Sequence, residues 1–212
     1  QTLNNQAGSI QSANELKITA DKVENQGGQL LAGLDTKLDV AQLNNQSGTI
    51  YSKKQLDLNV LGTTDNSAGT LAADQDLNLN TQNLLSDAGQ IRSENADLNL
   101  SIVQNIQNNS GLISAAKNLN LTTQNVTSQK GKIQSGANAN IQLNNLDNTE
   151  GIVYAAEQLQ LSATGELNNT QGVVAAEQLT DIKVGSVIND AGQIRSQQDQ
   201  LKLNVQKDIS NQ

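Results

Sequence analysis

Paired carboxylates are the side chains of this sequence whose types and spacing suit catalysis best. Asp74 lies two residues before Asp76, and Glu94 lies three residues before Asp97. Two neighbouring carboxyl groups can act as acid and base in the cleavage of a polysaccharide. Single acidic residues occupy the corresponding stretch elsewhere in the chain: Glu15, Glu157 and Glu177. Acids scattered in this way are more typical of solvated surface charge than of a catalytic site.

The composition excludes most other catalytic and metal-binding chemistry. The chain has no His and no Cys, which removes Ser-His and Cys-His nucleophiles, disulfides and zinc sites built from these ligands. A calcium site needs several converging oxygen ligands, and no loop of the D-x-D-x-D-G type is present. We therefore expect no enzymatic activity, no catalytic residue, no metal site and no cofactor.

Two tyrosines and two arginines are the remaining side chains that suit ligand binding. Tyr51 and Tyr154 each stand three residues after a glycine, and Arg92 and Arg195 occupy the same place after other glycines. Alternation along a strand places all four outward. The members of each pair are too far apart to share one small ligand, and isolated exposed aromatics are common. The sequence therefore predicts no binding site.

Charge and hydropathy limit the partners. The formal net charge is −8, so nucleic acid and anionic membrane surfaces are poor partners. No run of 18 apolar residues exists that could span a bilayer, and no signal peptide is recognisable. We expect no nucleic-acid binding and no membrane insertion by this segment.

A repeat of about twenty residues organises the whole chain. Ten glycines, each in a similar neighbourhood, recur at steps of 20 to 22 residues: Gly8, Gly28, Gly48, Gly69, Gly89, Gly111, Gly131, Gly151, Gly172 and Gly192. A period of this length is typical of a solenoid, in which each unit buries its apolar face against its neighbours. Residues 1–212 are therefore expected to form a single repeat domain.

Three pairs of alternating positions recur in every unit. An apolar residue and then Ala or Ser stand two and four residues after the glycine, as in Ile10 and Ser12. A Leu-x-Leu-like pair follows, as in Leu16 and Ile18, and an apolar residue and Asn precede the next glycine, as in Val23 and Asn25. Spacing of two indicates strands with one buried face. Each coil should have three short strands.

The predicted architecture is a right-handed parallel β-helix of about ten coils with three sheets, because parallel crossovers are overwhelmingly right-handed. A column of isoleucines should line it: Ile10, Ile50, Ile91, Ile133 and Ile194. A leucine-rich repeat is the alternative with a similar period. Its Asn follows a leucine cluster, whereas Asn follows a single apolar residue here.

The recurrent Asn and Gly have predicted structural roles. Asn in register can donate its amide hydrogen to the Asn of the next coil, as in stacked amide ladders. Glycine is expected to supply a positive φ that a side chain would strain.

Several units resemble the filamentous haemagglutinin repeats of large two-partner-secreted exoproteins. They include LNNQAGSIQSANELKITA, LNNQSGTIYSKKQLDLNV and LDNTEGIVYAAEQLQLSA, which approximately match L-x-N-x-x-G-x-I-x-[SA] followed by L-x-L. The resemblance covers essentially the full chain. It implies a right-handed β-helix, an internal fragment of a long stalk exported through an outer-membrane partner transporter in Gram-negative bacteria, and a secreted or cell-surface location. The family includes adhesins, haemolysin-type proteins and contact-dependent growth inhibition effectors.

Three functions remain open. The preferred one is a structural stalk segment that projects a distal binding or toxin-delivery region. The alternative is an adhesin module that binds glycan or protein along one sheet face, with a cell-surface receptor as partner. A polysaccharide-active enzyme ranks last, because such enzymes build clefts from long turn insertions and no step here exceeds 22 residues. Unpaired terminal strands also predict end-to-end self-association.

Overall fold

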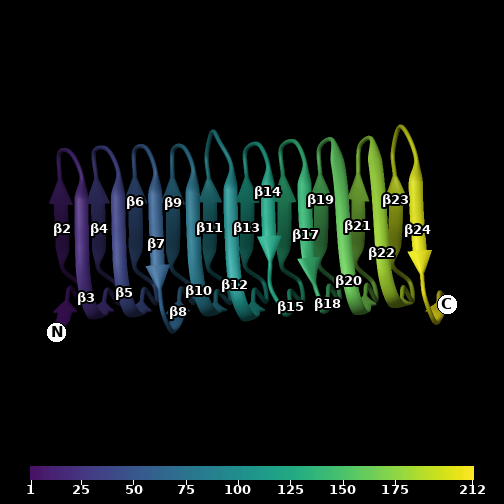
Figure 1. Cartoon of the computed structure of the whole chain (residues 1–212), viewed down its shortest axis with the longest axis horizontal. Coiled ribbons are helices and arrows are strands. Elements are labelled where there is room, and N and C mark those ends of the chain that lie inside the picture. The colour runs from purple at the N-terminus through teal and green to yellow at the C-terminus, as the bar shows by residue number, and fades with distance from the viewer.

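The computed structural model describes residues 1–212 and contains strands and turns but no helix. The chain winds into a β-solenoid of about ten coils, with its termini at opposite ends (Figure 1). In Figure 1 one set of strands rises behind, and the chain then crosses the top and descends in front while advancing toward the C-terminus. This path is right-handed. The predicted parallel β-helix is confirmed.

The first predicted strand of each coil forms a ten-stranded parallel sheet, which we call the narrow sheet. Its members are short because a turn with Ala or Ser at its start ends each of them. They are β2 (Ser9–Ser12), β4 (Gln29–Ala32), β6 (Thr49–Ser52), β9 (Thr70–Ala73), β11 (Gln90–Ser93), β13 (Leu112–Ala115), β16 (Lys132–Ser135), β19 (Ile152–Ala155), β21 (Val173–Ala176) and β23 (Gln193–Ser196).

The second and third predicted strands lie together in one fifteen-stranded parallel sheet, the wide sheet. In six coils they form one continuous strand: β3 (Leu16–Glu24), β5 (Thr36–Asn44), β10 (Leu77–Leu85), β12 (Leu98–Gln107), β20 (Gln158–Asn168) and β22 (Leu179–Ile188). Elsewhere they are separate: β7 (Leu56–Val60) and β8 (Thr63–Asp65), β14 (Leu119–Thr122) and β15 (Asn125–Thr127), β17 (Ala139–Leu143) and β18 (Asn145–Asp147), β24 (Leu201–Val205) and β25 (Ile209–Ser210), with β1 (Thr2–Asn4) at the start.

The sequence predicted three sheets, and the structure has two. Only four residues separate Ile18 from Val23, and they contain no turn signal. The backbone there stays extended, and Ala20 and Lys22 still pair with the next coil. The corner between the second and third strands is therefore shallow, and in six coils one strand runs through it.

Each strand pairs in parallel with its equivalent in the next coil. In the narrow sheet Ile10 pairs with Leu30, Leu30 with Ile50, and the register continues unbroken to Ile194. The five predicted isoleucines therefore lie in one column, as expected. Ile91 in its centre is fully buried.

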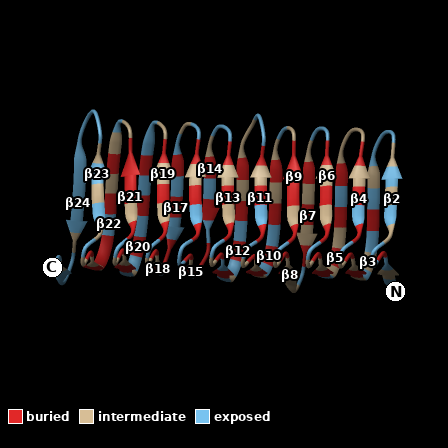
Figure 2. Ribbon diagram, turned by 180° about the vertical axis from the view of Figure 1, so that it is seen from behind, coloured by how far each residue is buried: buried red, intermediate tan, exposed pale blue.

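A single apolar core runs the length of the solenoid. Its 41 buried residues come from the inward rows of both sheets. The structure adds one row to those predicted, two residues after the Leu-x-Leu pair, with Val40, Val60, Ile102, Leu143 and Val184 among its members. The signal was present in the sequence as a continuation of the same alternation. In Figure 2 the inward positions of the central coils are buried, and strands β2, β23 and β24 at the ends are more exposed.

The Asn ladder before the glycine is confirmed. Asn25 Nδ2 donates to Asn45 Oδ1 at 2.7 Å and to the backbone oxygen of Gly28 in its own turn at 3.2 Å. Asn5 donates to Asn25 in the same way, also at 2.7 Å. The side chains are buried, so these bonds satisfy polar groups that would otherwise be costly to desolvate.

The predicted role of the glycine is wrong. Positive φ occurs at the residue before it, which is Ala7 (51°), Ser47 (53°) or Lys130 (56°) in different coils and a glycine only at Gly27. The repeated glycine is required for space. A Cβ on Gly28 would lie 2.1 Å from the backbone oxygen of Asn5 in the preceding coil. The turn backbones therefore stack too closely for any side chain at that position.

Candidate functional site

The two members of the first acidic pair have different hydrogen-bond partners. Asp74 accepts a hydrogen bond from the hydroxyl of Tyr51 at 2.6 Å. Asp76 instead accepts the backbone N–H of Asp97 in the next coil at 3.0 Å. Each carboxylate thus has its own structural partner.

The second acidic pair is divided in the same way. Glu94 forms an ion pair with Arg92, with 3.3 Å between Oε1 and Nη2. Asp97 accepts the backbone N–H of Asn118 at 3.0 Å and so caps the turn of the following coil. No three acidic side chains of the chain converge on a point where a metal ion could sit.

Tyr51 forms an organised cluster on the outer face of the narrow sheet. It pairs in register with Ala72 of the next coil, while its hydroxyl reaches Asp74 two residues beyond. The ring must therefore pass over Ala72, which points outward and yet is only 2% exposed. The hydrogen bond to Asp74 and partial burial raise the pKa of Tyr51 to about 12. The hydroxyl is therefore a proton donor at neutral pH.

Tyr154 repeats this arrangement. It pairs in register with Ala175, which is 0% exposed, and its hydroxyl donates to Glu177 Oε1 at 2.7 Å. That hydrogen bond and partial burial also raise the pKa of Tyr154. Glu177, predicted as a lone surface acid, is thus the equivalent of Asp74.

An arginine follows the alanine in each cluster. Arg92 pairs in register with Ala72, and Arg195 pairs with Ala175. Arg195 Nη1 donates to Gln193 Oε1 at 3.0 Å. We call these groups the tyrosine clusters: Tyr51, Ala72, Asp74 and Arg92, and Tyr154, Ala175, Glu177 and Arg195.

The sequence predicted that these tyrosines and arginines were isolated. They do point outward, as expected, and the two tyrosines do not share a site. Reading the outward position in three successive coils would have found Tyr, Ala and Arg side by side, twice. The hydrogen bond from each tyrosine hydroxyl to its carboxylate depends on the tyrosine rotamer, which the sequence does not specify.

The outer face of the wide sheet carries a second polar feature. Asn78 donates to Asp57, Asn99 to Asn78 and Asn120 to Asn99, each at 2.8 Å. A shallow hollow between this row and its neighbour is lined entirely by polar residues. Because the amides bond to one another, they stabilise the stacking of coils and leave few groups free for a ligand.

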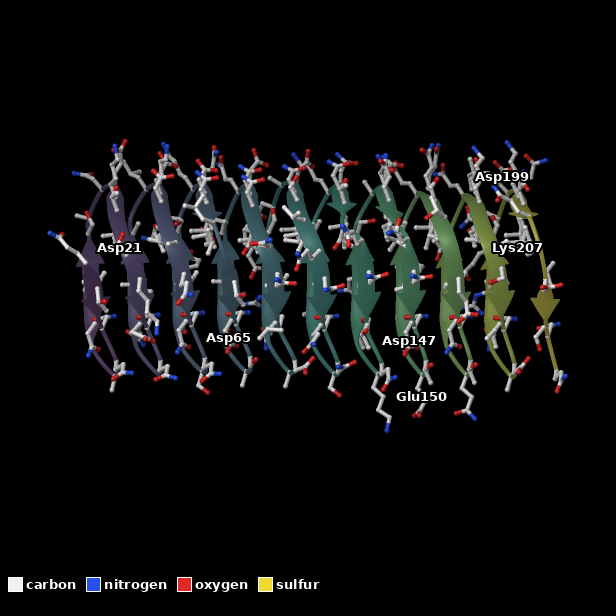
Figure 3. All side chains as sticks on the ribbon, turned by 60° about the horizontal axis from the view of Figure 1, so that its bottom comes forward. Asp21, Asp65, Asp147, Glu150, Asp199 and Lys207 are labelled. Carbon is white, nitrogen blue, oxygen red and sulfur yellow. The ribbon has the colours of Figure 1, made fainter.

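Acidic residues also cap the turn that follows the third strand. Asp65 and Asp147 lie in one row along the rod (Figure 3). Asp147 accepts the hydroxyl of Thr149 at 2.6 Å and the side-chain amide of Gln129 at 2.7 Å. Burial works to raise the pKa of Asp147, but these hydrogen bonds outweigh it and hold the pKa below its usual value.

These features define a class of protein: a parallel β-solenoid in which rows of amide side chains and several carboxylates hold neighbouring coils together. The structure contains no helix that could cross a membrane. The family model of the haemagglutinin repeat matches residues 1–60, 44–107 and 95–212. The chain therefore belongs to the haemagglutinin repeat family. No curated protein and no solved structure matches it significantly.

Proposed function

We propose that this chain is a rigid, non-enzymatic stalk segment of an exported surface protein, which holds a distal binding or toxin-carrying region away from the cell. The observation that supports this most directly is the continuity of the solenoid. The register of the narrow sheet passes from β2 to β23 without interruption, and one core of 41 residues follows it. A solenoid with an uninterrupted register and a single core is suited to spanning a distance.

The coil-to-coil bonds supply the stiffness. Backbone pairing continues through the turns, as when Gln29 donates to Gly8 at 2.8 Å and Thr49 donates to Gly28 at 2.9 Å. Bending the rod would break the backbone ladders of both sheets and the buried Asn ladder together. Ten coils at about 4.8 Å each give a rod about 48 Å long.

The family supports the proposed setting. Haemagglutinin repeats occur in secreted or surface-exposed proteins of two-partner systems. The partner we propose is therefore an outer-membrane transporter of this type, which passes the chain outward unfolded. Folding outside would then propagate coil by coil.

Small-angle X-ray scattering on the 212-residue chain and on a variant lacking Thr49–Gly151 tests the rod. That deletion joins Gly48 to Ile152 and preserves the phase of the repeat. We expect the rod to shorten by about 24 Å, which is five coils at about 4.8 Å, with an unchanged cross-section. A deletion of Thr49–Asn59, which breaks the phase, is the control and should disrupt the rod. A flexible or globular scattering profile from the parent chain would refute the stalk.

The cellular role is tested by placing the same Thr49–Gly151 deletion in the exported protein. A spacer predicts that the protein still reaches the surface and that its distal region lies closer to the cell. An enzyme predicts loss of a polysaccharide-cleaving activity, which Asp74→Asn with Asp76→Asn would also remove.

A further inference from the structure

The chain consists of two copies of one five-coil unit. The repeat glycine of each of the first five coils recurs 103 residues later: Gly8 and Gly111, Gly28 and Gly131, Gly48 and Gly151, Gly69 and Gly172, Gly89 and Gly192. The one-residue insertion after Gly89 recurs after Gly192. The heptapeptide Asp87–Ser93 recurs unchanged as Asp190–Ser196. Stacking coils need equal cross-sections, but they do not need this second, longer period.

Outward positions reveal what the two copies have kept. On the wide sheet Lys37, Asp57 and Asn59 correspond to Asn140, Gln160 and Ser162 in the second copy. On the narrow sheet Gln11 and Leu31 correspond to Ser114 and Gln134. Most side chains that face solvent have thus diverged between the copies.

The tyrosine clusters are among the outward residues that both copies retain. Tyr51, Ala72 and Arg92 recur as Tyr154, Ala175 and Arg195, and Gln90 recurs as Gln193. Asp74 becomes Glu177, which keeps the carboxylate that accepts the tyrosine hydroxyl. The packing of the solenoid does not require these outward residues, because other coils carry Gln, Leu or Ser in the same row. Their joint retention therefore points to a role at the surface.

We propose that the two tyrosine clusters are equivalent binding sites for a neutral polysaccharide that runs along the outer face of the narrow sheet. Each site offers a half-buried tyrosine that crosses an alanine of the next coil to reach its carboxylate. A carboxylate and a guanidinium flank the ring, at Asp74 and Arg92 in the first copy.

The chemistry of these groups fits a sugar. An aromatic face packs against the C–H face of a pyranose ring, while carboxylate and guanidinium groups exchange hydrogen bonds with its hydroxyls. The hydrogen bond to Asp74 or Glu177 fixes the tyrosine in place and lowers the entropy lost on binding. A net charge of −8 disfavours anionic polymers.

The spacing of the sites favours a polymer over a small ligand. Five coils at about 4.8 Å place the two tyrosines about 24 Å apart on the same face. One flexible chain can reach both sites, and binding at the first raises the effective concentration at the second. A polysaccharide should therefore bind much more tightly than a short oligosaccharide of the same sugar.

Affinity electrophoresis of the 212-residue chain tests the proposal. The gels contain soluble β-1,3-glucan, β-1,4-mannan, β-1,4-xylan or α-1,6-dextran, with alginate as the anionic comparison. The variants are Tyr51→Ala, Tyr154→Ala and the double variant. Gln11→Ala is the matched control, because Gln11 lies in the same outward row but outside the stretch between the two clusters. Circular dichroism establishes that each variant is folded, and Arg92→Gln with Arg195→Gln provides a second route if an alanine variant unfolds.

We expect at least one neutral polysaccharide to retard the parent and the Gln11→Ala control equally. Either single variant should weaken apparent affinity about 100-fold through lost bivalency, and the double variant should not be retarded. Three results would overturn the proposal: no neutral polysaccharide retards the parent, alginate retards it as strongly, or the double variant binds as the parent does.

Discussion

Ser128 and Asn148 occupy the same turn position in neighbouring coils, and the ladder of buried side chains is broken between them. Asn148 Nδ2 donates to Asn169 Oδ1 at 2.7 Å, but Asn148 Oδ1 accepts no hydrogen bond. Ser86 and Asn108 repeat the defect, because Asn108 Oδ1 is also buried without a partner. In both places the serine is too short to present a donor where an asparagine amide would lie.

Ser86→Asn and Ser128→Asn should each stabilise the protein. The new amide would donate to the orphaned Oδ1 of the next coil, in the geometry that joins Asn25 to Asn45. A completed buried hydrogen bond contributes about 0.5–1.5 kcal/mol. The free energy of unfolding in urea, followed by circular dichroism, measures the gain. Ser162→Asn, at an exposed position on the outer face of the wide sheet, is the control and should change little.

The turn glycines offer a matched pair of substitutions with unequal expected costs. Gly27 has a φ of 61° but open space around its Cα, and other coils carry Ala there. Gly27→Ala should therefore cost about 1 kcal/mol, the strain of a left-handed non-glycine residue. Gly28→Ala places its Cβ against the backbone oxygen of Asn5 and should cost about 3 kcal/mol or more, as severe overpacking does.

Urea unfolding of Gly27→Ala and Gly28→Ala measures which variant has the lower free energy of unfolding. If Gly27→Ala were the more damaging change, backbone conformation rather than coil spacing would govern the turn. The next coil carries Ser47 at the position of Gly27, and this serine adopts a φ of 53°. The structure therefore already contains a non-glycine residue in the conformation that Gly27→Ala would require.

The features that were predictable from sequence are those fixed by local alternation. Ile91 alternates with polar neighbours in its own strand, and the same pattern recurs ten times, so its column and burial follow from spacing alone. The row containing Val40 obeys the same rule and was missed only because the Leu-x-Leu pair was taken as the end of the strand.

The remaining features depend on contacts between coils. The need for Gly28 arises from the backbone of Asn5, 23 residues earlier, and a sequence pattern cannot distinguish that crowding from a positive φ. The bond from Tyr51 to Asp74 likewise crosses to the next coil. The merging of two predicted sheets reflects the shallow angle of a corner, which no residue type there signals.

Ile91→Ala tests the core directly. Ile91 is 0% exposed and stacks between Leu71 and Ile113 in the narrow sheet. Its truncation should lower the free energy of unfolding by about 2–5 kcal/mol through lost burial and the cavity left behind. Gln90→Ala, one residue earlier on the exposed face, should change it by less than about 0.5 kcal/mol. Equal effects at the two positions would contradict the inward register.

The pH dependence of stability should report the tyrosine cluster. The pKa of Tyr51 is about 12 in the folded chain and about 10 in an unfolded one. The folded state therefore holds the hydroxyl proton more tightly, and the resulting stabilisation is fully present below about pH 10 and is lost as the pH rises toward 12. Between about pH 10 and pH 12 the thermal stability of the parent should therefore fall more than that of Tyr51→Phe, which has no hydroxyl proton to lose. Since the chain has only Tyr51 and Tyr154, tyrosinate absorbance gives the titration itself. Titration of both tyrosines near pH 10 in the folded protein would show that neither hydroxyl is held by its carboxylate.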